Sequence, residues 1–150
     1  MDLIFRKGLL SDIDRTFAVR GQTRENPLSK DDLARYGITP ESIAVGVASK
    51  VIEGWVCLDD ADVVGFCNGD NTTGEVLVLA VLPAYEGKGI GKRLLANVVQ
   101  QLRASGFKTP WLAASPDARI RAYGFYRSLG WQPSGRCLKN GDQILELPGN

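Results

Sequence analysis

Three glycines at alternate positions, Gly87, Gly89 and Gly91, form the segment whose composition most clearly predicts chemistry. An apolar run typical of a strand precedes them, and an amphipathic helical pattern follows at once. Glycines at such a junction allow several backbone N–H groups to point to one place, at the positive end of the helix dipole. Lys88 and Lys92 would add positive charge beside those groups. The segment therefore predicts a binding site for a phosphate or pyrophosphate.

Two common nucleotide-binding motifs fit this segment poorly. The phosphate-binding loop of ATPases requires Ser or Thr after Gly-Lys to hold magnesium, whereas Arg93 follows Lys92 here. In the dinucleotide motif the third glycine comes one residue later, and the motif opens a parallel βαβ unit rather than following an antiparallel pattern. A glycine turn that only begins a core helix stays open as an alternative to a phosphate site.

The composition excludes several other kinds of site. The 150 residues include 18 Lys and Arg against 17 Asp and Glu, a formal net charge of +1, and no histidine. Without histidine there can be no Ser-His-Asp or Cys-His triad and no histidine-based zinc motif, so a carboxylate is the natural general base. The balanced charge argues against nucleic acid and anionic membranes as partners. We expect no metal site.

Cysteine usage bears on the compartment. Cys57, Cys67 and Cys137 lie far apart and form no Cys-x-x-Cys pair. An odd number without an N-terminal signal sequence favours a reducing environment, and no apolar run approaches the ~20 residues that span a bilayer. We expect a cytoplasmic protein in which Cys57 and Cys67 are small buried hydrophobic residues. The sequence leaves open whether the chain forms a homodimer.

The pattern of elements indicates one domain over residues 1–150. A short strand at residues 3–6 is expected first, and helices follow it. Their starts are predicted by three capping signatures: Ser11 with Asp14, Ser29 with Asp32, and Thr39-Pro40. Three β-rich runs, at residues 55–58, 63–69 and 75–82, then indicate an antiparallel meander.

The second half of the chain alternates strands and helices. An amphipathic helix is predicted from residue 90 to Gly106, followed by a strand at 111–114, a helix at 118–129 and a hairpin of strands 131–137 and 143–147. The expected fold is therefore of the α+β class, with a mixed central sheet flanked by helices.

Two segments in this order resemble the signatures of one enzyme family. Residues 81–95 are similar to motif A of the GNAT superfamily of acyl-CoA N-acyltransferases, whose core is Gln/Arg-x-x-Gly-x-Gly/Ala and here reads EGKGIG. Residues 122–131 match a second family signature, Ala-x-x-x-Tyr-x-x-x-Gly-aromatic. The resemblance covers residues 3 to 147 in element order. It implies a GNAT-like fold and an N-acetyltransferase that moves acetyl from acetyl-CoA directly to a primary amine of a small molecule or peptide.

The same resemblance implies where acetyl-CoA, the co-substrate, would bind. A β-bulge near residues 79–81 would splay two strands apart, free backbone donors, and allow one of them to polarise the thioester carbonyl. The expected binding residues are Leu79, Ala80, Val81, Gly87, Lys88, Gly89, Ile90, Gly91, Lys92 and Arg119. Glu86 replaces the usual Gln or Arg, and Arg119 stands where many relatives carry Asn. These departures keep open a non-catalytic acyl-CoA-binding sensor or interaction module.

The resemblance also implies roles in catalysis and acceptor binding. Tyr126 would be the general acid toward the departing thiolate, and Glu75 the general base. Glu75 lies six residues before Val81, so a regular strand would place both side chains on one face, and a bulge would not. Residues expected to recognise a carboxylate or another polar group of the acceptor are Arg20, Arg24 and Asn26.

Overall fold

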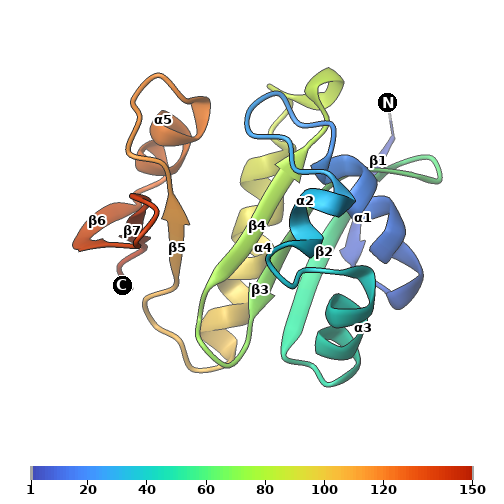
Figure 1. Cartoon of the computed structure of the whole chain (residues 1–150), viewed down its shortest axis with the longest axis horizontal. Helices are drawn as coiled ribbons and strands as arrows, with labels where there is room; N and C mark the ends of the chain where they lie inside the picture. The colour runs from blue at the N-terminus through green and yellow to red at the C-terminus, as the bar shows by residue number, and fades with distance from the viewer. Residues whose placement is uncertain (1, 150) are drawn as a thin grey trace.

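The computed structural model describes residues 2–149, which form two antiparallel sheets and the helices that cover them (Figure 1). The elements in chain order are β1 (Leu3–Lys7), the 3₁₀ helix η1 (Leu10–Asp12), α1 (Ile13–Arg20), α2 (Lys30–Ala34), α3 (Pro40–Ala48), β2 (Ile52–Asp59), β3 (Asp62–Asp70), β4 (Val76–Val81), the 3₁₀ helix η2 (Pro83–Tyr85), α4 (Ile90–Ala104), β5 (Trp111–Ala114), α5 (Arg121–Ser128), β6 (Gln132–Cys137) and β7 (Gln143–Glu146). The α+β class and the order of elements are confirmed.

The two sheets meet at a single point. The first sheet has the strand order β1-β2-β3-β4, and the second has the order β5-β7-β6. One isolated parallel bridge, between Glu75 and Trp111, joins them. Beyond this bridge β4 and β5 diverge toward the top of Figure 1. Within residues 2–149 the central sheet is therefore mixed only through this bridge, and it opens into a V between β4 and β5.

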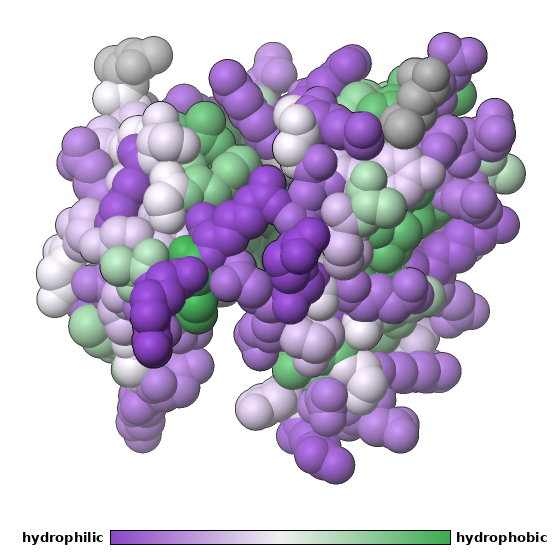
Figure 2. Space-filling view, turned by 90° about the horizontal axis from the view of Figure 1, so that it is seen from above, coloured by the Kyte–Doolittle hydropathy of each residue, from purple (hydrophilic) through white to green (hydrophobic). Residues whose placement is uncertain are grey.

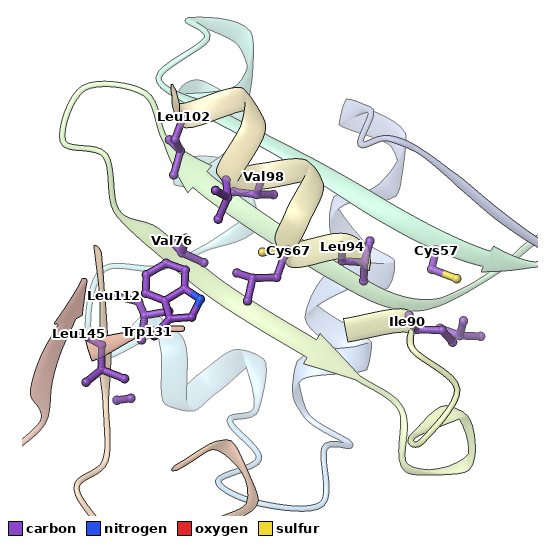
Figure 3. Close-up of a cluster of buried hydrophobic side chains, with 14 residues drawn as sticks. Cys57, Cys67, Val76, Ile90, Leu94, Val98, Leu102, Leu112, Trp131 and Leu145 are labelled. Carbon is purple, nitrogen blue, oxygen red and sulfur yellow. The ribbon is translucent and has the colours of Figure 1, made fainter. Parts of the chain in front are cut away.

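Helix α4 contributes the largest part of the core because its apolar side chains all lie on one face. The buried residues of this helix are Ile90, Leu94, Leu95, Val98, Val99 and Leu102, which is the face expected from the sequence. They pack against Cys57 and Cys67 of the first sheet, while Leu112, Trp131 and Leu145 bring the second sheet into the same cluster (Figure 3). This shared core holds the two sheets together across their narrow junction.

Helix α1 covers the opposite face of the first sheet. Its Val19 packs into a separate cluster with strand residues that include Phe66 and Ala80. Helices α2 and α3 pack on α1 through a third cluster that contains Phe17 and Leu33, and α3 also contacts β2 of the sheet. Within residues 2–149 no helix is long and apolar enough to cross a membrane.

The helix starts agree with the capping signatures in two cases and differ in one. Ser29 and Asp32 form a reciprocal capping box at α2, and Thr39 caps α3 ahead of its proline. Ser11 does not cap α1, because the 3₁₀ helix η1 precedes that helix. The carboxylate of Asp12 accepts the backbone N–H of Leu9 at 2.8 Å and pairs with a guanidinium from β1. A contact with another strand thus decides where this helical segment begins.

The β-bulge lies earlier in β4 than expected. Asn68 pairs with Val78, but the next residue of β3, Gly69, pairs with Val76, so Leu77 is left without a partner. The bulge is therefore at Leu77 and not at residues 79–81. The bulge falls just after the bridge to β5, where β4 and β5 begin to separate.

Candidate active site

A cleft of about 980 Å³ occupies the V between β4 and β5. Viewed from above, it is a hollow between the two halves of the molecule, rimmed by hydrophilic side chains (Figure 2). Its walls come from β4, β5, the segment before α4, the start of α5 and the loop after α1. The lining residues that the following paragraphs use are Arg20, Arg24, Glu25, Asn26, the strand 76–81, Glu86, Gly87, the segment 89–92, Arg121 and Tyr126. This volume is that of a typical site for a cofactor or drug-sized ligand.

One wall of the cleft is an open sheet edge. Strand β4 pairs with β3 on one side, and on the other side its only partner within residues 2–149 is the bridge at Glu75. The backbone of residues 76–81 therefore faces the cleft with amide groups that no neighbouring strand uses. An extended ligand that carries amides can hydrogen-bond to such an edge as an added strand would. Leu79, Ala80 and Val81, all expected in a cofactor site, belong to this wall.

The glycine segment lies at the wide end of the same wall. Gly87 and Gly89 have φ angles of 77° and 80°, the left-handed region that favours glycine, and Gly89 caps the N-terminus of α4. A Cβ added at either position would meet no atom within 4 Å, so the space above the backbone is open. The free N–H groups of the first turn of α4, at residues 90–92, point out of the helix here. The backbone here therefore has the conformation and the open space that an anion nest requires, although the side chain of Lys88 does not line the cleft.

Tyr126 reaches the cleft from α5 and is held there by aromatic contacts. Its ring lies edge-on to Phe125 and Trp131, with centroid separations of 5.2 and 6.1 Å. Its hydroxyl has no hydrogen-bond partner among residues 2–149. Burial, with a smaller contribution from Cys67, raises the pKa of Tyr126 above its usual value. The hydroxyl thus stays protonated at neutral pH and is available as a proton donor.

Glu75 lies next to the cleft but does not line it. It sits at the bridge to Trp111, at the closed end of the V. The following residue, Val76, packs on the α4 side together with Val81, so alternation places Glu75 on the α1 side. The bulge therefore removes the same-face relation of Glu75 and Val81 that a regular strand would have. Burial, and then the charge of Asp70, raises the pKa of Glu75.

Glu86 is the centre of a charge network that sequence reasoning missed. Its carboxylate accepts two hydrogen bonds from Nε of Arg24, at 3.1 and 3.2 Å, and pairs with the guanidinium of Arg121. Glu25 in turn accepts the backbone N–H of Arg121 at 2.8 Å. The acid beside the nest is therefore compensated by two cations, and the network ties together three elements at the mouth of the cleft. These partners are 62 and 35 residues away from Glu86 in the chain, and no local pattern marks them.

The residues expected to bind the acceptor divide into two groups. Arg20, Arg24 and Asn26 all line the cleft, but only Arg24 belongs to the Glu86 network. Arg20 is partly buried and has no side-chain hydrogen bond or ion pair within the described part of the chain, and burial lowers its pKa. Arg119 does not line the cleft: its exposed guanidinium pairs with Asp117 at 2.9 Å.

The cysteines take no part in the site. Cys57 and Cys67 are fully buried, as expected. Burial raises the pKa of the Cys57 thiol to about 11 and that of the Cys67 thiol still further. Since the thiolate is the nucleophilic form, neither side chain is suited to covalent catalysis. Residues 2–149 contain no group of three side chains placed to hold a metal ion.

Comparisons with known proteins identify the family of the chain. The sequence matches the model of the "Acetyltransferase (GNAT) family" over residues 18–131. It is 35% identical over 80 residues to an "Uncharacterized N-acetyltransferase ycf52-like" of Prochlorococcus marinus, covering 49% of this chain and 42% of that protein. It is 33% identical over 76 residues to the "[Ribosomal protein bS18]-alanine N-acetyltransferase" of Haemophilus influenzae, covering 49% of this chain and 51% of that protein. The alignments thus span about half the length of these relatives.

Similarity of structure extends further than similarity of sequence. The PaiA N-acetyltransferase from Thermoplasma acidophilum, solved in complex with coenzyme A, has a TM-score of 0.81 against this chain. The match covers 99% of both chains at 21% sequence identity. At this level of identity the comparison shows a common fold for essentially the whole chain.

Proposed function

The chain belongs to the acetyltransferase (GNAT) family, and from this premise we propose that it transfers the acetyl group of acetyl-CoA to a primary amine of a small molecule or peptide. One observation carries the proposal: the open edge of β4 leads directly into the glycine nest at the start of α4, and both face one cleft. An extended amide-bearing arm followed by a diphosphate has complementary partners along this path.

The residues present fit coenzyme A in chemistry as well as in shape. The nest at residues 87–92 offers backbone donors to the diphosphate, and Lys92 adds a positive charge at the cleft wall. The compensated charge of Glu86 means that this acid does not oppose a phosphate as an isolated carboxylate would. When bound, acetyl-CoA supplies the activated acetyl group as a thioester.

Groups in and next to the cleft would then perform three tasks. Backbone N–H groups along the edge of β4 stabilise negative charge that develops on the thioester oxygen. Tyr126 donates its proton to the sulfur as the carbon–sulfur bond breaks and the new carbon–nitrogen bond forms. Glu75 accepts the proton that the amine must lose, through a water molecule because it lies outside the cleft wall. A lysine-like amine has a pKa of about 10.4 and needs such a base at neutral pH.

The decisive experiment measures thiol release from acetyl-CoA with a panel of primary amines, alongside calorimetric titration with coenzyme A and with magnesium-ATP. We expect micromolar or tighter binding of coenzyme A, no binding of ATP, and amine-dependent thiol release. Coenzyme A binding without thiol release for any amine would overturn the transferase and favour a sensor. Binding of magnesium-ATP in place of coenzyme A would overturn the cofactor assignment.

A variant pair tests the nest itself. Gly89→Val places a side chain over the open backbone and should weaken coenzyme A binding at least tenfold. Gly106→Val is the matched control, because Gly106 also has a positive φ and open space around its Cβ position but lies at the other end of α4. Both substitutions strain the backbone by about 1–2 kcal/mol. Equal coenzyme A affinity in the two variants would contradict the assignment of the nest to phosphate.

A further inference from the structure

Arg20 differs from the other cationic side chains of the cleft in being partly buried and, among residues 2–149, also without an anionic partner. Among residues 2–149, the cationic side chains that line the cleft are Arg20, Arg24, Lys92 and Arg121. Arg24 and Arg121 share the carboxylate of Glu86. Lys92 pairs with no described acid either, but it is exposed and lies in the first turn of α4, beside the nest. Arg20 forms no side-chain hydrogen bond or ion pair with any described residue.

The surroundings of Arg20 make this lack of a partner costly. Its guanidinium is partly buried, and burial is the cause that lowers its pKa. An arginine side chain in a protein stays charged even so. Burying a charge without a partner is unfavourable, and an anion that enters the cleft would recover much of that cost. A guanidinium presents paired donors that match the two oxygens of a carboxylate.

The position of Arg20 points to the acceptor rather than to the phosphates. Arg20 is the last residue of α1, which packs on the face of the sheet opposite to α4. Its neighbour Val19 packs in the same cluster as Val78 and Ala80 of the open strand. The nest, by contrast, is part of the N-terminus of α4. The arginine that does contact the segment beside the nest is Arg24, four residues after Arg20, which forms an ion pair with Glu86.

We propose that Arg20 binds a carboxylate of the acceptor, so that the natural substrate is an amine that also carries an acidic group, as an amino acid or a peptide with a free carboxyl end does. The inference rests on the proposed transfer to an amine and narrows its substrate class. Arg20 then acts as a specificity-determining residue: it orients the acceptor by its acid end and leaves the amine toward the thioester.

Matched acceptors test this directly. Pairs that differ only in a carboxylate against a carboxamide are β-alanine and β-alaninamide, L-lysine and L-lysinamide, and trialanine and its amide. Thiol release gives kcat/KM for both members of each pair. A charged hydrogen-bonded pair is worth roughly 10- to 100-fold, so the wild type should favour the acid of at least one pair by that factor. Arg20→Gln should reduce the ratio to about one, mainly through KM, and Arg20→Lys should restore part of it.

Two controls separate this role from others. Arg35→Gln removes an arginine on α2 whose side chain is 78% exposed and pairs with Asp32 at 3.8 Å, and it should leave every ratio unchanged. Titration of Arg20→Gln with coenzyme A should give wild-type affinity. Weaker coenzyme A binding with unchanged ratios would assign Arg20 to a phosphate and overturn the proposal. Turnover of the amides equal to that of the acids would overturn it while leaving the transferase intact, and no turnover of any amine would overturn both.

Discussion

Replacing Tyr126 by phenylalanine removes one hydroxyl group and leaves in place everything that the ring packs against. The edge-on contacts with Phe125 and Trp131 involve the ring alone, so the variant keeps them. The hydroxyl has no hydrogen-bond partner among residues 2–149, so no donor or acceptor of the protein is left unpaired. Removing such a group is close to neutral for folding, within about 0.5 kcal/mol. For a chain of this size that corresponds to a change in Tm of roughly 2 °C or less.

The effect on catalysis should be far larger. Loss of a positioned general acid lowers the rate by about 10²- to 10⁴-fold, which is a rise of roughly 3–5 kcal/mol in the activation barrier. The raised pKa of Tyr126 keeps the acid form present, so the wild type should lose no activity through its ionisation below the usual tyrosine pKa of about 10. Coenzyme A affinity should be unchanged, because the hydroxyl is needed only as the thiolate leaves.

Three measurements on the Tyr126→Phe variant test whether Tyr126 is the general acid: thermal unfolding, titration with coenzyme A, and thiol release under saturating acetyl-CoA and amine. A fall in kcat of at least a hundredfold with unchanged Tm and coenzyme A affinity is the expected result. A kcat within threefold of wild type, with the fold intact, would refute the acid role of Tyr126. A loss of more than about 5 °C in Tm would refute the packing argument instead.

Three further substitutions test the base, the close packing against α4 and the open space at a glycine of α5. The pKa of Glu75 is raised in the fold, so its ionisation opposes folding at neutral pH: Glu75→Gln should raise Tm at pH 7, and the difference should vanish as pH falls and Glu75 takes up its proton. Activity of the wild type should be lost as pH falls through that raised pKa, and a Glu75→Gln variant with the same acid limb would exclude Glu75 as the base. A Cβ at Gly69 would lie 2.8 Å from Cγ1 of Val98, so Gly69→Ala should cost about 1–3 kcal/mol of unfolding free energy. Gly124→Ala, in a helix with open space around the new methyl group, should instead stabilise by up to about 1 kcal/mol. Denaturant unfolding gives the free energy of unfolding of the Gly69 and Gly124 variants, and a change of the same sign in both would contradict the packing argument.

Parts of the site were predictable from sequence because they depend on neighbours in the chain. Glycine at positions 87 and 89 permits the left-handed backbone of the nest, and the helical repeat after residue 90 specifies which side chains of α4 are buried. The capping box of Ser29 and Asp32 is equally local, since its two hydrogen bonds join residues three apart. Placing Tyr126 in the cleft required a family signature, because helical spacing alone is also satisfied by a core tyrosine.

Other features depended on which elements come together in space. Ser11 does not take its expected capping role, because the 3₁₀ helix η1 precedes α1 and the carboxylate of Asp12 in η1 pairs with an arginine on β1. The bulge at Leu77 arises from the pairing of β4 with β3, and with it the face that Glu75 occupies. Arg119, by contrast, pairs with Asp117 only two residues away, and its exposed side chain does not line the cleft.

By itself, then, the sequence determined the class of fold, the nest and the helix behind it, because these follow from backbone preferences and from periodicities of a few residues. Only the tertiary structure decided which charges are paired. Glu86 pairs with Arg24 and Arg121 across the mouth of the cleft, whereas Arg20 pairs with no described residue. The strength of an ion pair depends on the distance between the two charges in space. Packing of helices and sheets brings together groups that lie far apart in the chain, so this distance cannot be predicted from their separation in the sequence.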